Sequence, residues 1–187
     1  MSTDRETVQI PGFVAGTWTV DPNHSSVGFT IRHVMTKIRG KFETFEATIV
    51  TAENLVDSSL TAVVDMSSIS TGSGQRDKHL RSGDFFDVET HPQMRFVSTG
   101  VRLLDEERAE IIGDLTIRGI TKQVALDVEI IGFGKDSRGV MRAGFSATGE
   151  INRRDFGVSW NSVLEGGGFA LADKVQINLE VSAALQD

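Results

Sequence analysis

The sequence predicts an all-β fold of about eight strands, each with one apolar face. The first observation is a one-by-one alternation of apolar and polar residues, which recurs along most of the 187-residue chain. This period of two is that of a β-strand with one face in water. The second is that no long stretch of helical periodicity separates these segments, which argues against alternating strands and helices. The third is a content of 19 glycines, which suits many turns.

The predicted elements follow one another with short gaps. Residues 1–15 carry no strand pattern and predict a flexible N-terminal arm, which leaves 16–187 as one β-domain. After a turn signal at Asp21-Pro22-Asn23, alternate residues are apolar in the following stretches: 27–33, 45–49, 60–66, 94–96, 111–117, 124–130, 141–151 and 175–183. Each of these stretches is expected to form a strand.

One segment, 72–92, interrupts the alternation and predicts a helical insertion between strands. Ser73 is placed to cap a short helix over 75–81. Asp84 is expected to cap a second turn, which tucks the two phenylalanines after it inward. An insertion of this kind suits a lid or plug at one end of a closed sheet.

Strands with a single apolar face can bury that face in two ways, in a sandwich of two sheets or in one sheet closed on itself. Closure has the advantage that it removes exposed sheet edges. The apolar face mixes small residues, such as Ala47 and Gly113, with aromatic ones, and it carries Met66, Met94 and Met141. Small side chains leave free volume in a closed barrel, and methionines tolerate variable contents. A packed core and an apolar cavity both remain open at this point.

Composition excludes several classes of protein. A net charge of −7 argues against a general affinity for nucleic acid or for anionic lipid surfaces. No stretch approaches the ~18 apolar residues of a membrane span, so an integral membrane protein is not expected. Residues 1–11 lack the pattern of a secretory signal, which predicts a cytoplasmic location. The outer face is only moderately charged, which allows a homodimer.

Motifs for catalysis or metal binding are weak. The four histidines, His24, His33, His79 and His91, form no ligand pair of usual spacing, so neither a metal nor a cofactor is predicted. His33 continues an apolar face, where it serves either as a polar group at a cavity mouth or in a structural hydrogen bond. Asp77 and His79 are two positions apart and do not face each other on a helix, which argues against an acid–base pair. No catalytic residue is therefore predicted.

Several motifs together resemble a known family. They are Trp18, Asp21, His24-Ser25 and the alternation 27–33, then Arg76-Asp77, His79-Leu80, Asp84-Phe85-Phe86-Asp87 and His91-Pro92, and finally Gly113, Leu115-Thr116-Ile117, Thr121-Lys122, Arg153 and Phe156-Gly157. In this order, over about residues 16–185, the chain resembles the YceI-like, polyisoprenoid-binding family. The resemblance implies a lipocalin-like, eight-stranded antiparallel β-barrel with a short helical insertion, around an apolar tunnel that holds a polyprenyl chain. Many relatives carry a secretion signal, and the polar start of this chain departs from them.

We therefore expect a non-enzymatic protein that binds, stores or transports a long-chain isoprenoid lipid, either a polyprenyl chain or an isoprenoid quinone. Lid residues 72–92 would gate its exchange. One alternative is an enzyme acting on a small apolar substrate in the barrel with Asp77, His79 or His33, and another is a structural protein with a filled core. The residues expected to line the lipid are Val27, Phe29, Ile31, His33, Phe45, Leu60, Phe96, Leu126, Phe145, Ile177 and Leu179.

Overall fold

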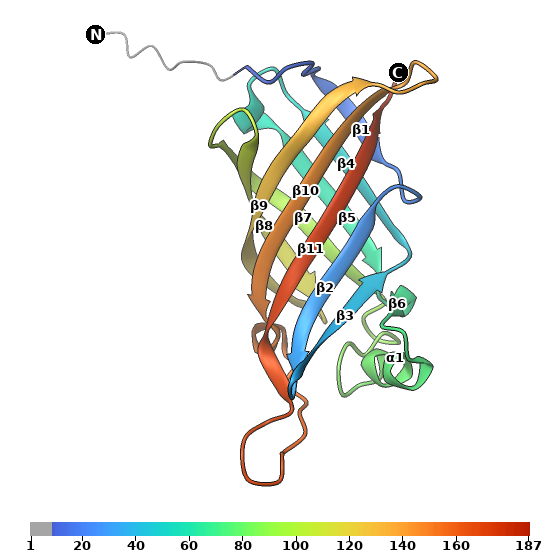
Figure 1. Cartoon of the computed structure of the whole chain (residues 1–187), viewed down its shortest axis with the longest axis vertical. Helices are drawn as coiled ribbons and strands as arrows, with labels where there is room; N and C mark the ends of the chain where they lie inside the picture. The colour runs from blue at the N-terminus through green and yellow to red at the C-terminus, as the bar shows by residue number, and fades with distance from the viewer. Residues whose placement is uncertain (1–8) are drawn as a thin grey trace, which may run out of the picture.

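A long antiparallel β-barrel dominates the computed structural model, which describes residues 9–187 (Figure 1). Its strands are β1 (Gly16–Val20), β2 (Ser26–His33), β3 (Thr36–Phe42), β4 (Phe45–Thr51), β5 (Ser59–Asp65), β6 (Ile69–Ser70), β7 (Gln93–Leu103), β8 (Arg108–Ile117), β9 (Ile120–Lys135), β10 (Met141–Asn152) and β11 (Leu171–Leu185). The helical elements are α1 (Gly74–Arg81) and the 3-10 turns η1 (Leu55–Asp57), η2 (Met66–Ser68) and η3 (Arg153–Phe156).

The sheet closes on itself, because β11 pairs with β10 on one side and with both β1 and β2 on the other. The elements β1 and β2 are thus two parts of one broken strand. In the same way β3 and β4 form the next strand, and β5 and β6 the one after it. Counted so, residues 9–187 form eight strands, and every pairing is antiparallel. The predicted eight-stranded barrel is confirmed.

The first break in the barrel wall lies where the sequence signals a turn, between β1 and β2. One oxygen of Asp21 accepts a hydrogen bond from the backbone N–H of Asn23, and the other lies 2.8 Å from His24 Nδ1. These bonds hold the pKa of Asp21 below its ordinary value, with the His24 bond as the largest cause. The turn signal therefore marks a kink within a strand rather than the start of one.

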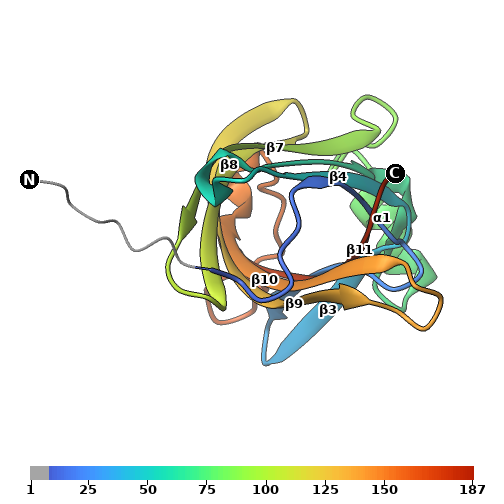
Figure 2. The same cartoon turned by 90° about the horizontal axis from the view of Figure 1, so that it is seen from above.

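The N-terminal segment closes the upper end of the barrel. Residues 1–8 of the predicted arm lie outside the described residues, whereas the segment that leads into β1 passes across the upper opening (Figure 2). There Ile10 is buried, and the ring of Phe13 lies 5.5 Å from that of Phe133. Residues 9–15 are thus packed on the barrel and not a free arm, because Ile10 and Phe13 contact a hydrophobic surface at the barrel's upper end.

Beneath this segment the upper end is filled by Trp18, whose side chain is fully buried (0% exposed). Its indole Nε1 donates a hydrogen bond of 2.8 Å to Thr51 Oγ1, and its ring packs edge-on against Phe133. The Thr51 hydroxyl in turn donates to the carbonyl of Val14. Apolar packing and one satisfied polar network together seal this end.

The lid segment 72–92 lies at the lower end, beside β3 and β6 (Figure 1). The predicted helix is confirmed as α1, and the Ser73 hydroxyl accepts a hydrogen bond from the backbone N–H of Arg76. The capping role expected for Asp84 is wrong. The carbonyl of Ser82 instead accepts the N–H groups of the following turn, and Asp84 Oδ2 lies 2.8 Å from His79 Nε2. The Asp84 carboxylate is thus paired with the imidazole of His79 rather than with a backbone N–H.

Candidate functional site

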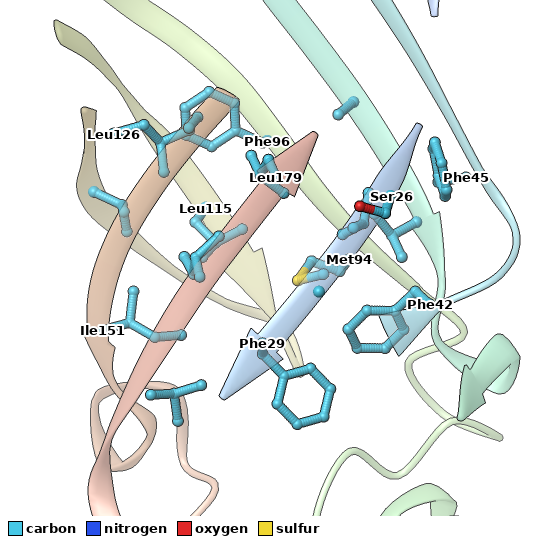
Figure 3. Close-up of a pocket in the computed structure, with 18 of the residues that line it drawn as sticks. Ser26, Phe29, Phe42, Phe45, Met94, Phe96, Leu115, Leu126, Ile151 and Leu179 are labelled. Carbon is cyan, nitrogen blue, oxygen red and sulfur yellow. The ribbon is translucent and has the colours of Figure 1, made fainter. Parts of the chain in front are cut away.

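An apolar cavity of about 520 Å³ runs inside the barrel, within the ~300–1,000 Å³ typical of ligand sites. Large side chains from strands on opposite sides of the wall point into it, among them Phe29, Phe96, Leu126 and Leu179 (Figure 3). A fully packed barrel would have supported the filled-core alternative. The observed cavity contradicts that alternative.

All eleven residues predicted to line a lipid do lie along this cavity. They are Val27, Phe29, Ile31, His33, Phe45, Leu60, Phe96, Leu126, Phe145, Ile177 and Leu179. Whether a lipid touches them stays a prediction. Of the three methionines expected on the apolar face, Met94 lines the cavity, while Met66 is buried beside it in the packed core.

The cavity stays open because large side chains lie flat along the wall. The ring of Phe96 on β7 lies where a Cβ on Gly113 of β8 would be, and the ring of Phe29 covers Gly40 in the same way. A Cβ on Gly149 would come within 2.8 Å of the Leu126 side chain. A larger residue at these glycines would push its neighbour toward the barrel axis. The small residues of the apolar face therefore keep its centre free.

Partial exposure of inward-facing residues supports this description. Leu60, Phe145, Ile177 and Leu179 all point away from bulk water, yet none of them is fully buried. In a filled barrel such positions would lose nearly all accessible surface. Here the uncovered surface faces the cavity, so an apolar ligand that filled it would bury additional apolar area.

The cavity has polar lining residues higher up, such as Ser26 and Ser59, but its arginine and histidine side chains lie at the lower end. Arg76, His79, Arg153 and Asn161 line it there, and His33 joins them from the end of β2. The exposed ring of His33 fits the predicted position at a mouth. Most of the lining higher up is hydrocarbon, and Ser26 is the labelled residue there that carries an oxygen (Figure 3). The lower end is therefore the part of the site that can recognise a polar head.

Arg153 is the buried cation of this lower end. Its guanidinium donates to the carbonyls of Ala172, Val158 and Trp160 at 2.8–2.9 Å, and the Asp173 carboxylate lies 3.8 Å away. Burial lowers the pKa of Arg153 from its ordinary value, while Asp173 acts in the opposite direction. These bonds fix the loop 157–170 to the rim of the barrel. Sequence reasoning assigned no role to Arg153, because its partners are backbone carbonyls.

Two further arginines hold the lid, and one of them, Arg118, ties it to the same rim. Arg118, in the turn between β8 and β9, donates to the carbonyls of Phe85 and Gly157. Arg76 donates to the hydroxyl and the carbonyl of Thr71. The lid therefore rests on hydrogen bonds at its edges, with the ring of Phe85 as its buried anchor.

The alternative acid–base pair does not form. The Asp77 carboxylate accepts hydrogen bonds from the N–H and the hydroxyl of Thr71, whereas His79 pairs with Asp84 and packs its ring against Trp160. The histidines are also spread widely, and residues 9–187 contain no group of three or more side chains able to hold a metal ion. The structure thus brings together a lining for an apolar molecule and leaves the proposed catalytic groups apart.

Sequence reasoning missed several aromatic or apolar residues of the site, among them Ile10, Phe133 and Trp160. Each of these three lies in a stretch without clear alternation. Phe133 follows the glycine-bearing bend of β9, where the register with β10 shifts. A search for large apolar residues just outside the alternating stretches would have found them.

Comparisons with known proteins agree with this geometry. Residues 18–183 match the model of the YceI-like domain. The protein YceI of Escherichia coli O157:H7 is 38% identical over 149 residues, which cover 78% of each chain. A YCEI protein of Campylobacter jejuni has a similar crystal structure (TM-score 0.71, 30% identity, 82% of this chain and 88% of that one).

A third similar structure is a polyisoprenoid binding domain from Saccharophagus degradans, implicated in plant cell wall breakdown. It covers 90% of this chain and 98% of its own at a TM-score of 0.69, with 12% identity, so the likeness is one of fold. Within residues 9–187 no helix is long and apolar enough to cross a membrane. With a family model matching nearly its whole length and a relative at 38% identity, this chain belongs to the YceI-like family.

Proposed function

We propose that the barrel binds a single long-chain isoprenoid lipid, with its tail in the cavity and its head at the lower end. The observation that carries this proposal is the open, largely hydrocarbon-lined cavity with a rim of polar side chains at its lower end. The fold shared with a polyisoprenoid binding domain supports it. An isoprenoid chain is long, apolar and flexible, which matches a cavity that is elongated along the barrel.

Burial of the tail provides the driving force. Each CH₂ removed from water contributes ~0.8 kcal/mol. The ordering of a flexible chain offsets much of this sum. The glycine-backed rings of Phe29 and Phe96 already lie against the wall, so the chain need not displace them. A preformed lumen of this kind keeps the cost of binding low.

Release and loading would pass through the lower end, because the sheet is closed above it, whereas residues 36–40 of β3 have a partner strand on one side only. There the buried ring of Phe85 anchors the lid 72–92, and Arg118 holds its edge through a hydrogen bond to the Phe85 carbonyl. Such bonds can be exchanged for bonds to water at small net cost. A head group would find donors in His33, Asn161 or the lid. The protein would then store or carry the lipid without altering it.

Native mass spectrometry tests this proposal directly. Protein exposed to an isoprenoid quinone is expected to gain the mass of one quinone. The variant Ala62→Trp places an indole in the lumen, since Ala62 lines the cavity opposite Ala47, and it should lose most of this signal. The control Ala125→Trp puts the same side chain on the exposed outer face of β9 and should bind as the unmodified protein does.

Two outcomes would overturn lipid binding in the lumen. One is no bound lipid in purified or in quinone-exposed protein. The other is equal binding by both tryptophan variants, because that would place the lipid outside the barrel. Catalysis on a bound lipid would appear in the same spectra as a changed ligand mass. The cytoplasmic location, the homodimer and the absence of a cofactor stay predictions.

A further inference from the structure

The lower end of the barrel carries an unusual surface at the turn between β2 and β3. Met35 is 94% exposed, and Val34 beside it is also exposed. Val34 has a φ of +55°, a conformation that costs a β-branched residue about 1–2 kcal/mol. A two-residue hairpin turn is normally filled by Gly, Asn or Asp. Folding alone therefore does not explain two hydrophobic residues at this tip.

A second exposed apolar element lies beside this tip. The backbone N–H of Val34 donates to the carbonyl of Ala170 at 2.7 Å, which joins the turn to the loop 157–170. In that loop Val163 (75% exposed) pairs across a short bridge with Phe169 (59% exposed). The loop extends farthest from the lower end of the barrel (Figure 1). The two elements thus form one apolar end surface, made of Val34, Met35, Val163 and Phe169.

The strands behind the tip are strongly basic. Residues 30–42 contain four Lys or Arg side chains and no Asp or Glu, in a chain with 26 acidic and 19 basic residues. Arg32 on β2 lies directly opposite Lys37 on β3, and Arg39 follows on the same outer face. Among residues 9–187, no carboxylate lies within ion-pairing distance of these three side chains. Like charges directly opposite each other destabilise a sheet, so this arrangement favours an anionic partner.

The need to protect a sheet edge explains only part of this pattern. Charged residues on an exposed edge discourage aggregation, and β3 is such an edge except where β6 pairs with it. Arg32, however, lies on β2, which is paired on both sides. Edge protection also gives no reason for the exposed Met35. The opposite end of the barrel differs in charge, since the turn between β7 and β8 carries Asp105, Glu106 and Glu107.

We propose that the lower end of the barrel docks on an anionic lipid bilayer, with the apolar end surface inserted between head groups. The basic face of β2 and β3 would lie against lipid phosphates. The charge difference between the two ends would orient the approaching protein, although its net charge is −7. Apolar insertion together with basic attraction is the pattern of proteins that bind membrane surfaces. The inference rests on the proposed function, because docking would bring the polar mouth of the lumen to the membrane.

Vesicle sedimentation tests the docking separately from lipid loading. The vesicles contain phosphatidylcholine and phosphatidylglycerol, without isoprenoid, at low salt. The full-length protein is expected to sediment with them, but not with phosphatidylcholine alone or at about 1 M salt, where charges are screened within ~3 Å. The variant Lys37→Glu/Arg39→Glu should weaken binding at least about 30-fold. Each basic group near an anionic membrane surface raises the affinity by a factor of about five, and the variant removes two of them.

The matched control is Lys135→Glu/Arg138→Glu at the upper end, where both side chains are exposed. It makes the same change in net charge and should bind as the unmodified protein does. Met35→Gln should weaken binding about tenfold with no change in charge. Equal loss of vesicle binding in both charge variants would overturn docking. So would a full-length protein that does not sediment with the vesicles, a result that would also fit a protein partner at this surface. Native mass spectra of the same variants show separately whether the lumen still takes up quinone.

Discussion

Both ends of the barrel contain a buried aromatic ring, Trp18 at the upper end and Phe85 at the lower end, but the lower end also depends on arginine hydrogen bonds to backbone carbonyls. At the upper end, Trp18, Phe133 and the segment 9–15 form a packed apolar plug. At the lower end, Arg118 and Arg153 hold the lid and the loop 157–170 through hydrogen bonds to backbone carbonyls. An apolar plug opens only at the full cost of exposing its surface, whereas hydrogen bonds can be exchanged for bonds to water. The difference favours a fixed upper end of the lumen and a lower mouth that opens.

The largest expected effect comes from breaking the upper plug. Trp18→Ala removes a fully buried indole and should lower the free energy of unfolding by about 3–5 kcal/mol. The matched change at the lower end is Trp160→Ala, which removes the only other tryptophan. Trp160 is part-exposed, so its loss should cost only about 1–2 kcal/mol. Urea unfolding monitored by circular dichroism measures the free energy of unfolding of both variants. Equal decreases in this free energy would contradict the distinction between the two ends.

A smaller effect is expected from loosening the lower mouth. Arg153→Ala removes the donors that hold the carbonyls of Val158, Trp160 and Ala172, at a cost of about 2 kcal/mol. Amide hydrogen exchange should rise in 157–172 and stay unchanged around Trp18. The neighbouring Arg154→Ala breaks a half-exposed pair with Asp173 and an exposed cation–π contact with Phe169, and it should cost about 1 kcal/mol. Faster exchange throughout the barrel would contradict a locally held mouth.

The smallest effect concerns the turn between β9 and β10 at the upper end. The N–H of Val140 is the largest cause that holds the pKa of Asp136 below its ordinary value of 3.8, and Arg142 adds to it. The stability from this carboxylate is therefore complete above pH 3.8 and is lost as the pH falls through the lower folded-state pKa. An NMR titration of the Asp136 carboxyl carbon should show a midpoint below 3.8. A midpoint at or above that value would show that the turn does not hold the charge.

The sequence was sufficient for the strands that form the long side of the barrel. In β9, β10 and β11 the alternation runs long enough to give both the strand and its inward face, and it placed Leu126, Phe145, Ile177 and Leu179 along the cavity. The short helix α1 was also predictable, because its cap at Ser73 is a local signal. These features depend on neighbours along the chain, which is what a single sequence shows.

Features that depend on distant partners could not be predicted in this way. The alternation in β3 is hard to recognise, because its inward position Gly40 has no side chain. The ring of Phe29 from β2 covers this position instead. The role of residues 9–15 depends on the surface that Phe133 provides far along the chain. The role of Arg153 depends on carbonyls of a loop without regular structure. Each of these requires the register of the closed sheet to be known first.

The most direct test of the account is a crystal structure of the protein loaded with an isoprenoid quinone. We expect continuous density for one chain along Phe29, Phe96 and Leu126, with its ring beside His33 or Asn161 at the lower mouth. The upper plug around Trp18 should be unchanged. Density only on the outer surface, or a lumen filled by the protein's own side chains, would contradict the central claim that this barrel encloses a ligand.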